Sequence, residues 1–180
     1  MARLEPIELD KLTPEQKELH ARVGRGRNRV MGPFSVWIHN PPLADAASRL
    51  INSVRENGKL ESRLYELIVL TVARKAGVQY AFAVHEPIAL AAGLAPDVLE
   101  ALRAQKKPAF SRPDESLAYE AVTALLETGK LPDAIYQALL KQFGLDLTIE
   151  IITVVGIYGM IGTVLNAFEV PTPNGEKPFG

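Results

Sequence analysis

The chain has 180 residues, of which 47% are hydrophobic and 23% charged, and its formal net charge is -1. This composition is that of an ordinary globular protein with one domain and a full core. The near-neutral charge argues against a general nucleic-acid binder. The lack of cysteine excludes disulfides, zinc–thiolate sites and thiol redox chemistry on this chain.

The N-terminal segment is polar and contains no apolar stretch of the kind found in secretory signal peptides, so we expect a cytoplasmic protein. The first helix is predicted to start at Thr13. Threonine is a good N-cap, Pro14 suits the first helical position, and Gln16 completes a capping box. We expect this helix to end near Val23.

The segment 24–29, rich in glycine and arginine, follows this helix. It lacks the preceding strand of a phosphate-binding loop and the interleaved aromatic residues of a nucleic-acid loop. We interpret it as a solvated loop, the alternative being that one arginine binds an anionic ligand or a neighbouring subunit. A short apolar segment, 34–39, comes next, and a second helix is expected from Leu43 to Glu56.

The centre of the chain predicts two helices that meet at Gly77. In the first of them, apolar residues recur at a spacing of 3.6. The second should run from Val78 to Ala92, and Pro87 inside it predicts a kink or an early break near Ala83.

Three further helices are predicted over 96–104, 114–128 and 132–143, the first opened by Pro96 and the last two ended by glycine. We interpret the acids at helix starts as solvated groups that complement the helix dipole: Glu61, Asp114 and Glu115.

The last predicted helix, Ile151 to Leu165, contains no charged residue. It is shorter than the ~20 residues of a membrane span, so we expect a buried core helix and no membrane association. Gly156, Gly159 and Gly162 recur at every third position and predict a strip where another helix can approach closely. No long alternating pattern is present, and the fold class is therefore all-α.

Three blocks of the sequence resemble the carboxymuconolactone decarboxylase and alkylhydroperoxidase-D-like family. They lie at 32–41, at 63–94 and at 165–171, in the family's order. The resemblance implies a single-domain helical bundle of about eight helices that assembles as a trimer or hexamer. It divides the chain into an N-terminal arm with one helix (1–33), the helical domain (34–171) and a C-terminal tail (172–180).

The resemblance also assigns functional positions. Peroxidase-type members place Cys-x-x-Cys-x-x-x-His on the second central helix, with a glutamate from the first. His85 and Glu66 match, whereas the cysteine positions are Val78 and Ala81 here. Members without thiols usually carry an acid at the position of Ala81. Thiol peroxidase activity is therefore not expected.

His85 and Glu66 are the candidate catalytic residues. A carboxylate beside an imidazole favours the protonated imidazole, and such a pair can hold and deliver one proton. Position 81 lies one turn before His85 on the same helix face. The alternative is a structural pair in which a core histidine and a buried glutamate join two helices.

Further aromatic and polar residues are candidates for substrate binding, although each is equally explained as core packing or as a partner of buried polar groups. They are Trp37, Tyr80, Phe82, Tyr158 and Asn166. The three histidines follow no metal-ligand spacing, so no metal site is expected.

The predicted function is that of a cofactor-free enzyme that performs general acid–base chemistry on a small anionic or carbonyl substrate, as a decarboxylase, isomerase or lyase. The alternative is a non-catalytic ligand-binding or structural homologue that has lost the acid at Ala81. In either case we expect a homo-oligomer that binds neither nucleic acid nor membranes.

Overall fold

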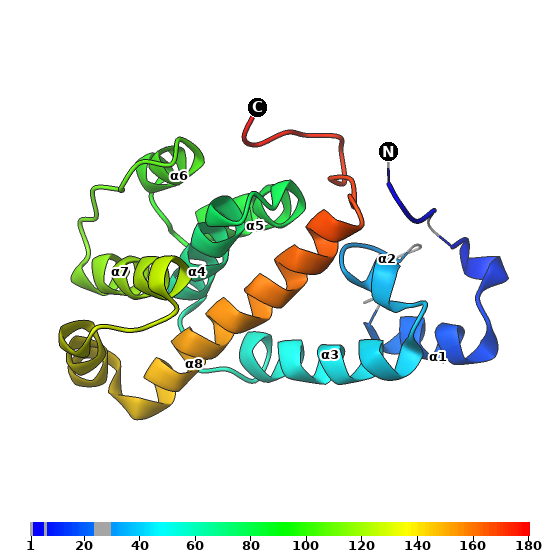
Figure 1. Ribbon diagram of the computed structural model, residues 1–180, viewed down its shortest axis with the longest axis horizontal. Coiled ribbons are helices and arrows are strands. Elements are labelled where there is room, and N and C mark those ends of the chain that lie inside the picture. Colours follow the sequence, from blue (N-terminus) through cyan, green and yellow to red (C-terminus); the bar gives the residue numbers. More distant parts are fainter. Residues whose placement is uncertain (1, 6, 24–29) are drawn as a thin grey trace.

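The computed structural model describes residues 2–5, 7–23 and 30–180, and this part of the chain is all-α (Figure 1). A short 3₁₀ turn at Leu9–Lys11 precedes eight α-helices. They are α1 (Pro14–Val23), α2 (Phe34–Trp37), α3 (Pro41–Arg55), α4 (Ser62–Lys75), α5 (Gln79–Ala91), α6 (Pro96–Arg103), α7 (Pro113–Thr128) and α8 (Asp133–Ala167). The predicted loop 24–29 lies outside the described residues.

Helix α4 is the centre of the molecule. Its residues are buried without interruption from Arg63 to Ala73, and it packs against α5, α7 and α8, with a smaller contact to α6. Figure 1 shows α8 crossing beside α4 and α5, and α3 crossing α8 on its other side. Because α4 is covered on all sides, close packing holds its side chains in fixed positions. Such a helix can hold polar groups at defined distances from one another.

Local sequence signals set several helix ends as predicted. The hydroxyl of Thr13 accepts a hydrogen bond from the Gln16 amide at 3.2 Å, and the Gln16 side chain accepts one from the Thr13 amide at 3.0 Å. Asn40 caps α3 by accepting from the Leu43 amide, and α3 therefore begins at Pro41, two residues before the predicted start. Gly129 ends α7 in the left-handed conformation, with φ of 69°.

One expected helix break is wrong, and one helix starts earlier than predicted. Helix α5 continues through Pro87 without the expected break. The helix expected over 132–143 does end at Gly144, which makes a kink inside α8 with φ 75° and ψ 174°, but the helix that follows the kink begins before the expected Ile151. The residues between this kink and Ile151 are exposed or half-buried apart from Thr148, with Leu145 58% and Ile149 55% exposed.

Helix α8 is, within the described residues, the one helix with the length and apolar composition of a membrane span. However, 44% of its apolar window is buried inside the molecule, and it packs against α3, α4 and α7. One side of α8 is thus part of the core, while other apolar residues of the helix are exposed. Its glycine strip serves the fold at one point: a Cβ on Gly162 would lie 2.7 Å from Val78, whereas the space beside Gly156 and Gly159 is open.

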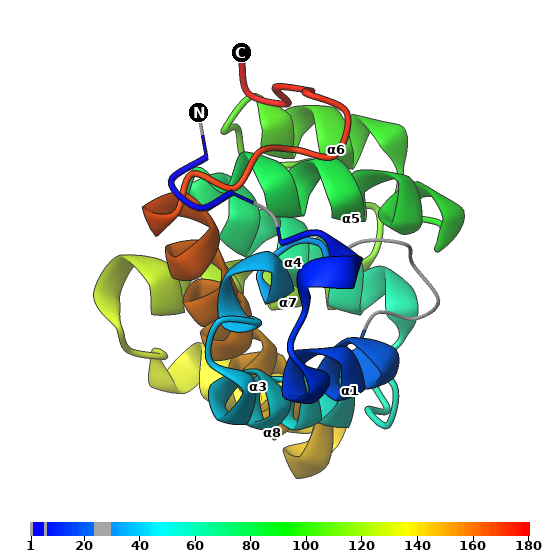
Figure 2. The same cartoon turned by 90° about the vertical axis from the view of Figure 1, so that its right-hand side faces the viewer.

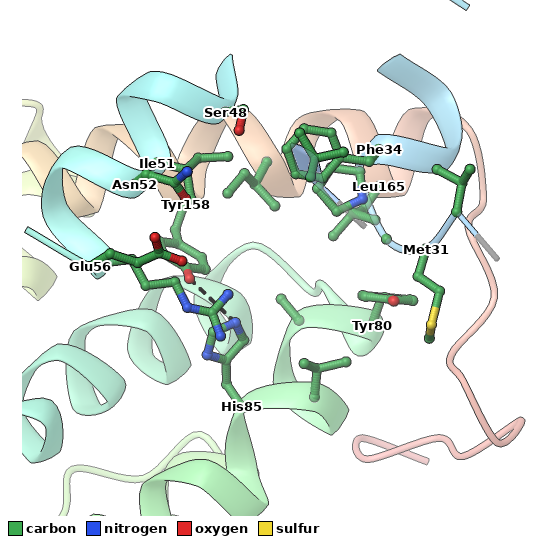
Figure 3. Close-up of a pocket in the computed structure, with 18 of the residues that line it drawn as sticks. Met31, Phe34, Ser48, Ile51, Asn52, Glu56, Tyr80, His85, Tyr158 and Leu165 are labelled. Carbon is green, nitrogen blue, oxygen red and sulfur yellow. Dashed lines mark hydrogen bonds between the residues drawn. The ribbon is translucent and has the colours of Figure 1, made fainter. Parts of the chain in front are cut away.

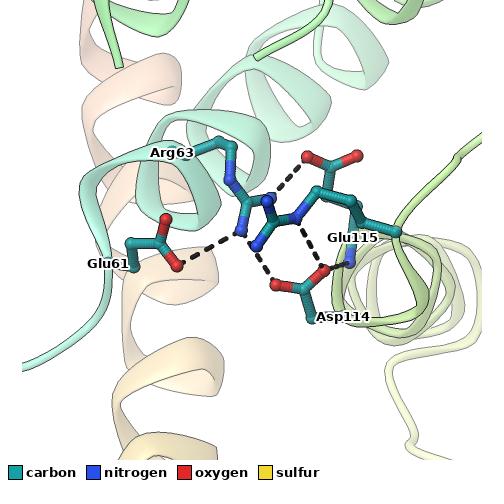
Figure 4. Close-up of polar contacts among 5 residues, drawn as sticks. Glu61, Arg63, Asp114 and Glu115 are labelled. Atoms are coloured by element: carbon teal, nitrogen blue, oxygen red, sulfur yellow. Dashed lines mark hydrogen bonds and ion pairs between the residues drawn. The ribbon is translucent and has the colours of Figure 1, made fainter. Parts of the chain in front are cut away.

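The sequence suggested that the acids at the start of α7 are solvated, but in the structure they are largely buried. Asp114 and Glu115 pair with Arg63 of α4, whose side chain is 3% exposed (Figure 4). Glu61 joins the same arginine at 3.2 Å. A buried guanidinium needs several partners to offset its desolvation. The three acids provide these partners, and the charge of Arg63 in turn favours their ionised form.

The two ends of the chain lie side by side at one end of the molecule (Figure 2). The Arg3 amide donates to the Phe168 carbonyl at 3.0 Å, and the Arg3 side chain pairs with Glu169. In the tail, Phe179 packs edge-on against Phe82 with ring centroids 5.0 Å apart. The division into arm, domain and tail at 33 and 171 stays a prediction.

Candidate active site

Glu66 and His85 are brought together by the turn between α4 and α5. Gly77 makes this turn with φ of 65°, and the two helices then pack along their length. The Glu66 Oε2 atom lies 2.6 Å from Nδ1 of His85. The two side chains are only 4% and 7% exposed. The two side chains are therefore within hydrogen-bond distance, as predicted.

Two tyrosines extend this pair into a chain of polar groups. The Tyr158 hydroxyl lies 3.3 Å from Nε2 of His85. The Tyr65 hydroxyl donates a hydrogen bond to the Tyr158 hydroxyl at 3.2 Å. Burial, above all, raises the pKa of both phenols, that of Tyr158 well above its ordinary value, so Tyr158 stays protonated. A neutral His85 with its proton on Nδ1 fits this chain, because Nε2 then accepts from Tyr158 while Nδ1 donates to Glu66.

A cavity of about 350 Å³ opens beside His85 (Figure 3). This volume is in the range of small-molecule sites. Figure 3 shows His85 and Tyr80 on one side of the cavity, α3 residues such as Asn52 opposite, and Met31 and Phe34 toward one end. Much of the remaining wall is apolar, which favours an organic ligand with a hydrocarbon body.

Of the predicted site residues, His85, Tyr80 and Tyr158 line this cavity. Ala81, one helical turn before His85 on α5, lines the cavity as well. The position that carries an acid in the predicted family pattern therefore faces the cavity. Glu66 stands behind His85 and lines instead a second cavity of about 200 Å³. Glu66 is therefore placed to orient His85 rather than to touch a ligand in the larger cavity.

Three predicted binding residues are not among those that line the cavity. Phe82 is fully buried and covered by the C-terminal tail. Trp37 is buried against Phe34, its ring edge-on at 5.4 Å. Asn166 donates to the Ala76 carbonyl at 2.9 Å and so satisfies the end of α4. Each has the structural role that was the alternative interpretation.

Sequence reasoning missed the contribution of α1 and α3 to the cavity. His20 of α1 and, on α3, Ser48, Asn52 and Arg55 line its wall. The α3 residues recur at intervals of four and three, which is one helix face. That spacing was a usable signal, but a polar helix face ordinarily faces solvent, and the sequence does not reveal that this one faces α5.

Within the described residues, no group of three His, Cys, Asp or Glu side chains is placed to hold a metal ion. His85 has one carboxylate beside it, that of Glu66, and its other nitrogen faces a phenol. Each ring nitrogen of His85 thus has a hydrogen-bonding group beside it.

The comparison with protein families agrees with this geometry. The model of the carboxymuconolactone decarboxylase family matches residues 41–124, which include Glu66, Ala81 and His85. Over this segment, a little under half of its length, the chain is similar to the family. Its two catalytic candidates therefore lie inside the matched segment, whereas α1 and the cavity residues of α8 lie outside it. A comparison with curated proteins found no match.

Solved structures share the fold of this chain at low identity. A peroxidase-related protein with an alkylhydroperoxidase AhpD core, from Ralstonia eutropha, is 16% identical with a TM-score of 0.80, covering 99% of this chain and 97% of its own. A protein of unknown function from Agrobacterium tumefaciens, described as a putative antioxidant defence protein AhpD, is 19% identical with a TM-score of 0.68 (79% and 99% covered).

A third structure is the debrominase Bmp8, as a cysteine-to-alanine variant in complex with 2,3,4-tribromopyrrole. It is 17% identical with a TM-score of 0.67, and the match covers 94% of this chain and 91% of that one. At these identities the three structures show the fold alone. They agree with the all-α class expected from the sequence.

Proposed function

We propose that this protein is a small-molecule enzyme that performs general acid–base chemistry at His85, on an anionic or carbonyl substrate. The observation that carries the proposal is the buried 2.6 Å contact between Glu66 and His85 at the edge of the 350 Å³ cavity. A histidine with one nitrogen fixed by a carboxylate and the other directed at a ligand cavity is the usual arrangement of a catalytic base.

In the proposed reaction, neutral His85 takes a proton from a carbon next to a carbonyl group and returns it at another position. In a decarboxylation, His85 would first take up a proton from solvent and, as the imidazolium, would give it to the carbanion left when CO₂ departs. Glu66 holds the ring and stabilises the imidazolium that forms. The Tyr158 hydroxyl lies at a long hydrogen-bond distance from Nε2, 3.3 Å, which a substrate can displace or use as a donor to its developing oxyanion. All these groups belong to the protein, so the proposal needs no cofactor.

Thiol peroxidase chemistry is not part of the proposal. The positions of the two cysteines in the family pattern are Val78 and Ala81, and Val78 is buried against Gly162. Methionine thioethers cannot form the thiolate that attacks a peroxide.

A second candidate function is a binding protein without turnover. Ala81 favours it, since this residue lines the cavity where an acid would be expected in relatives of the non-thiol type. In that case the Glu66–His85 pair would serve the fold and the cavity would hold a ligand unchanged. Saturable binding by the native protein without any conversion of the ligand would favour this alternative.

The test is turnover of a panel of lactones, β-keto acids and muconate-like acids by the purified protein and three variants. His85→Gln and Glu66→Gln should reduce the rate by about 10²–10⁴-fold, the usual contribution of a positioned acid or base. His39→Gln is the control, because His39 is exposed and lies away from the cavity. Equal rates for native protein and His85→Gln would contradict the proposal.

A further inference from the structure

One wall of the large cavity is a polar face of α3, formed by Ser48, Asn52 and Arg55. Figure 3 shows Ser48 and Asn52 on α3, across the cavity from His85. The part of the chain that the structure describes provides no hydrogen-bond or ion-pair partner for any of the three α3 side chains. Ser48 and Asn52 are half-buried and Arg55 is exposed, so either water or a ligand in the cavity can bind their polar groups. This face is therefore available to a ligand.

Arg55 gives the face its charge. Among the described residues that line the cavity, Arg22 is paired with Asp45 at 3.0 Å. Glu56 also lines the cavity and has an interaction of its own. Burial raises the pKa of Tyr158, and the positive charge of Arg55 acts against this rise. Arg55 lines the same cavity as His85 and Tyr158.

His20 adds a second unused group, from α1. Its Nε2 atom is buried and has no hydrogen-bond partner within the described residues, and the side chain lines the same cavity. A buried imidazole nitrogen without a partner is unfavourable. It accepts or donates according to its tautomer, so a hydroxyl or a carbonyl oxygen of a ligand would satisfy it.

We propose that α1 and α3 form the recognition wall of the site: Arg55 and Asn52 bind the carboxylate of an organic acid with an apolar body, and His20 binds a second oxygen of the same molecule. Arginine is the side chain best suited to a carboxylate, through its paired donors. The apolar wall residues, which include Ile51 and Ile161, would contact the body of the acid.

This inference deepens the proposed function and rests on it for the reaction, although binding can be measured separately. Arg55 lines both the large cavity and the smaller one behind Glu66. A carboxylate held by Arg55 therefore lies next to the Glu66–His85 pair. The carbon atoms nearest the carboxylate would be those that exchange a proton with His85.

Calorimetric titration with a matched pair of probes tests the role of Arg55. The native protein should bind 3-phenylpropanoate about tenfold more tightly than 3-phenylpropanamide, which has the same shape without the charge. Arg55→Met should remove this preference and Asn52→Ala should reduce it. Arg49→Met is the control on the same helix, since Arg49 pairs with Asp45 and does not line the cavity.

A third probe, 3-(4-hydroxyphenyl)propanoate, tests His20. Its hydroxyl should improve binding to the native protein several-fold, and His20→Phe should remove the improvement while keeping the preference for the acid over the amide. His39→Phe, at an exposed position, should behave as the native protein does. A hydroxyl effect that survives in His20→Phe would remove His20 from the recognition wall.

Equal affinity for acid and amide, an acid preference that persists in Arg55→Met, or no binding of any probe would overturn the inference. Repeating the titrations with His85→Gln separates it from the proposed function. If the acid preference persists there while no compound is turned over by any variant, the recognition wall stands and the enzymatic function fails. If turnover depends on His85 but binding does not depend on Arg55, the enzymatic function stands and the recognition wall fails.

Discussion

At the scale of single residues, Ala81 decides how much negative charge His85 meets. Ala81 is buried, faces the large cavity and lies four positions before His85 on α5. The helix therefore places any side chain at position 81 beside the imidazole. With alanine there, Glu66 is the one carboxylate that the described residues place against the ring.

Ala81→Glu should change the pH range over which the His85 imidazole takes up its proton. A second carboxylate either favours the imidazolium or binds a proton itself, because two close carboxylates resist ionising together. NMR titration of the imidazole in the native protein and the variant measures this. Ala81→Gln has nearly the same size without the charge and should follow the native curve. Identical curves for native and Ala81→Glu would mean that position 81 does not face His85.

Tyr158→Phe should lower turnover by about 10²-fold, the usual effect of removing one donor to a developing oxyanion. Burial, followed by the neighbouring Tyr65, raises the pKa of Tyr158 well above its ordinary value, so the hydroxyl is available as a donor throughout the neutral pH range. Tyr65→Phe, which keeps the Tyr158 hydroxyl, is the matched control and should have a smaller effect. Equal losses in both variants would point to a structural role for the pair.

At the scale of helices, the ion cluster around Arg63 joins α4 to α7. The guanidinium contacts Glu115 and lies 2.8 Å from Asp114. Burial alone would raise the pKa of Asp114, but the hydrogen bond and the charge of Arg63 outweigh it and lower the pKa below its ordinary value of 3.8. The cluster holds the N-terminal end of α4 against α7, and Glu66 is one turn further along α4.

Asp114→Asn should reduce the free energy of unfolding at pH 7 by about 1–3 kcal/mol, the cost of losing a charged hydrogen bond at a poorly exposed site. Because the folded pKa is lowered, this stabilisation is fully present above the unfolded pKa and is lost as the pH falls through the folded pKa. Urea denaturation from pH 7 to pH 3 should therefore show the difference between native and variant shrinking below about pH 4.

The control for this series is Asp133→Asn, at the start of α8, where the acid is exposed and makes no ion pair within the described residues. Its effect should stay within about 0.5 kcal/mol at both pH values. A constant difference between native protein and Asp114→Asn over the whole pH range would contradict the role of the charge.

At the scale of the whole molecule, the outer surface of α8 leaves apolar side chains uncovered. Leu145 and Ile149 are 58% and 55% exposed, and Met160 is 37% exposed. Exposed apolar side chains concentrated on one helix are typical of contact surfaces between subunits. We propose that the protein is a homo-oligomer, a trimer or a hexamer, with this part of α8 in the contact.

Light scattering at micromolar concentration should give the mass of a trimer or a hexamer of the 19.7 kDa chain. Ile149→Glu places a charge in the proposed contact and should shift the protein toward the monomer. Leu43→Glu puts the same charge on an exposed leucine of α3, 50% exposed, and should leave the mass unchanged. A monomeric native protein would refute the proposal.

The sequence by itself determined those features that depend on local chemistry. Capping groups set the start of α1 through Thr13 and Gln16, because the hydrogen bonds join residues three positions apart. Apolar periodicity predicted the α4–α5 pair, and a single glycine turn forces two such helices to pack with their facing residues in contact. This is why the contact between Glu66 and His85 was predictable from the chain.

The tertiary structure alone decided which surfaces meet over longer distances. Phe82 is covered by Phe179, almost a hundred residues away, so an aromatic residue next to the site became part of the core. Asp114 and Glu115 are buried because Arg63 of another helix faces them. The α3 face became a cavity wall because of how α3 packs across α8. Sequence spacing defines the face of a helix, but only packing determines whether that face meets solvent, core or ligand.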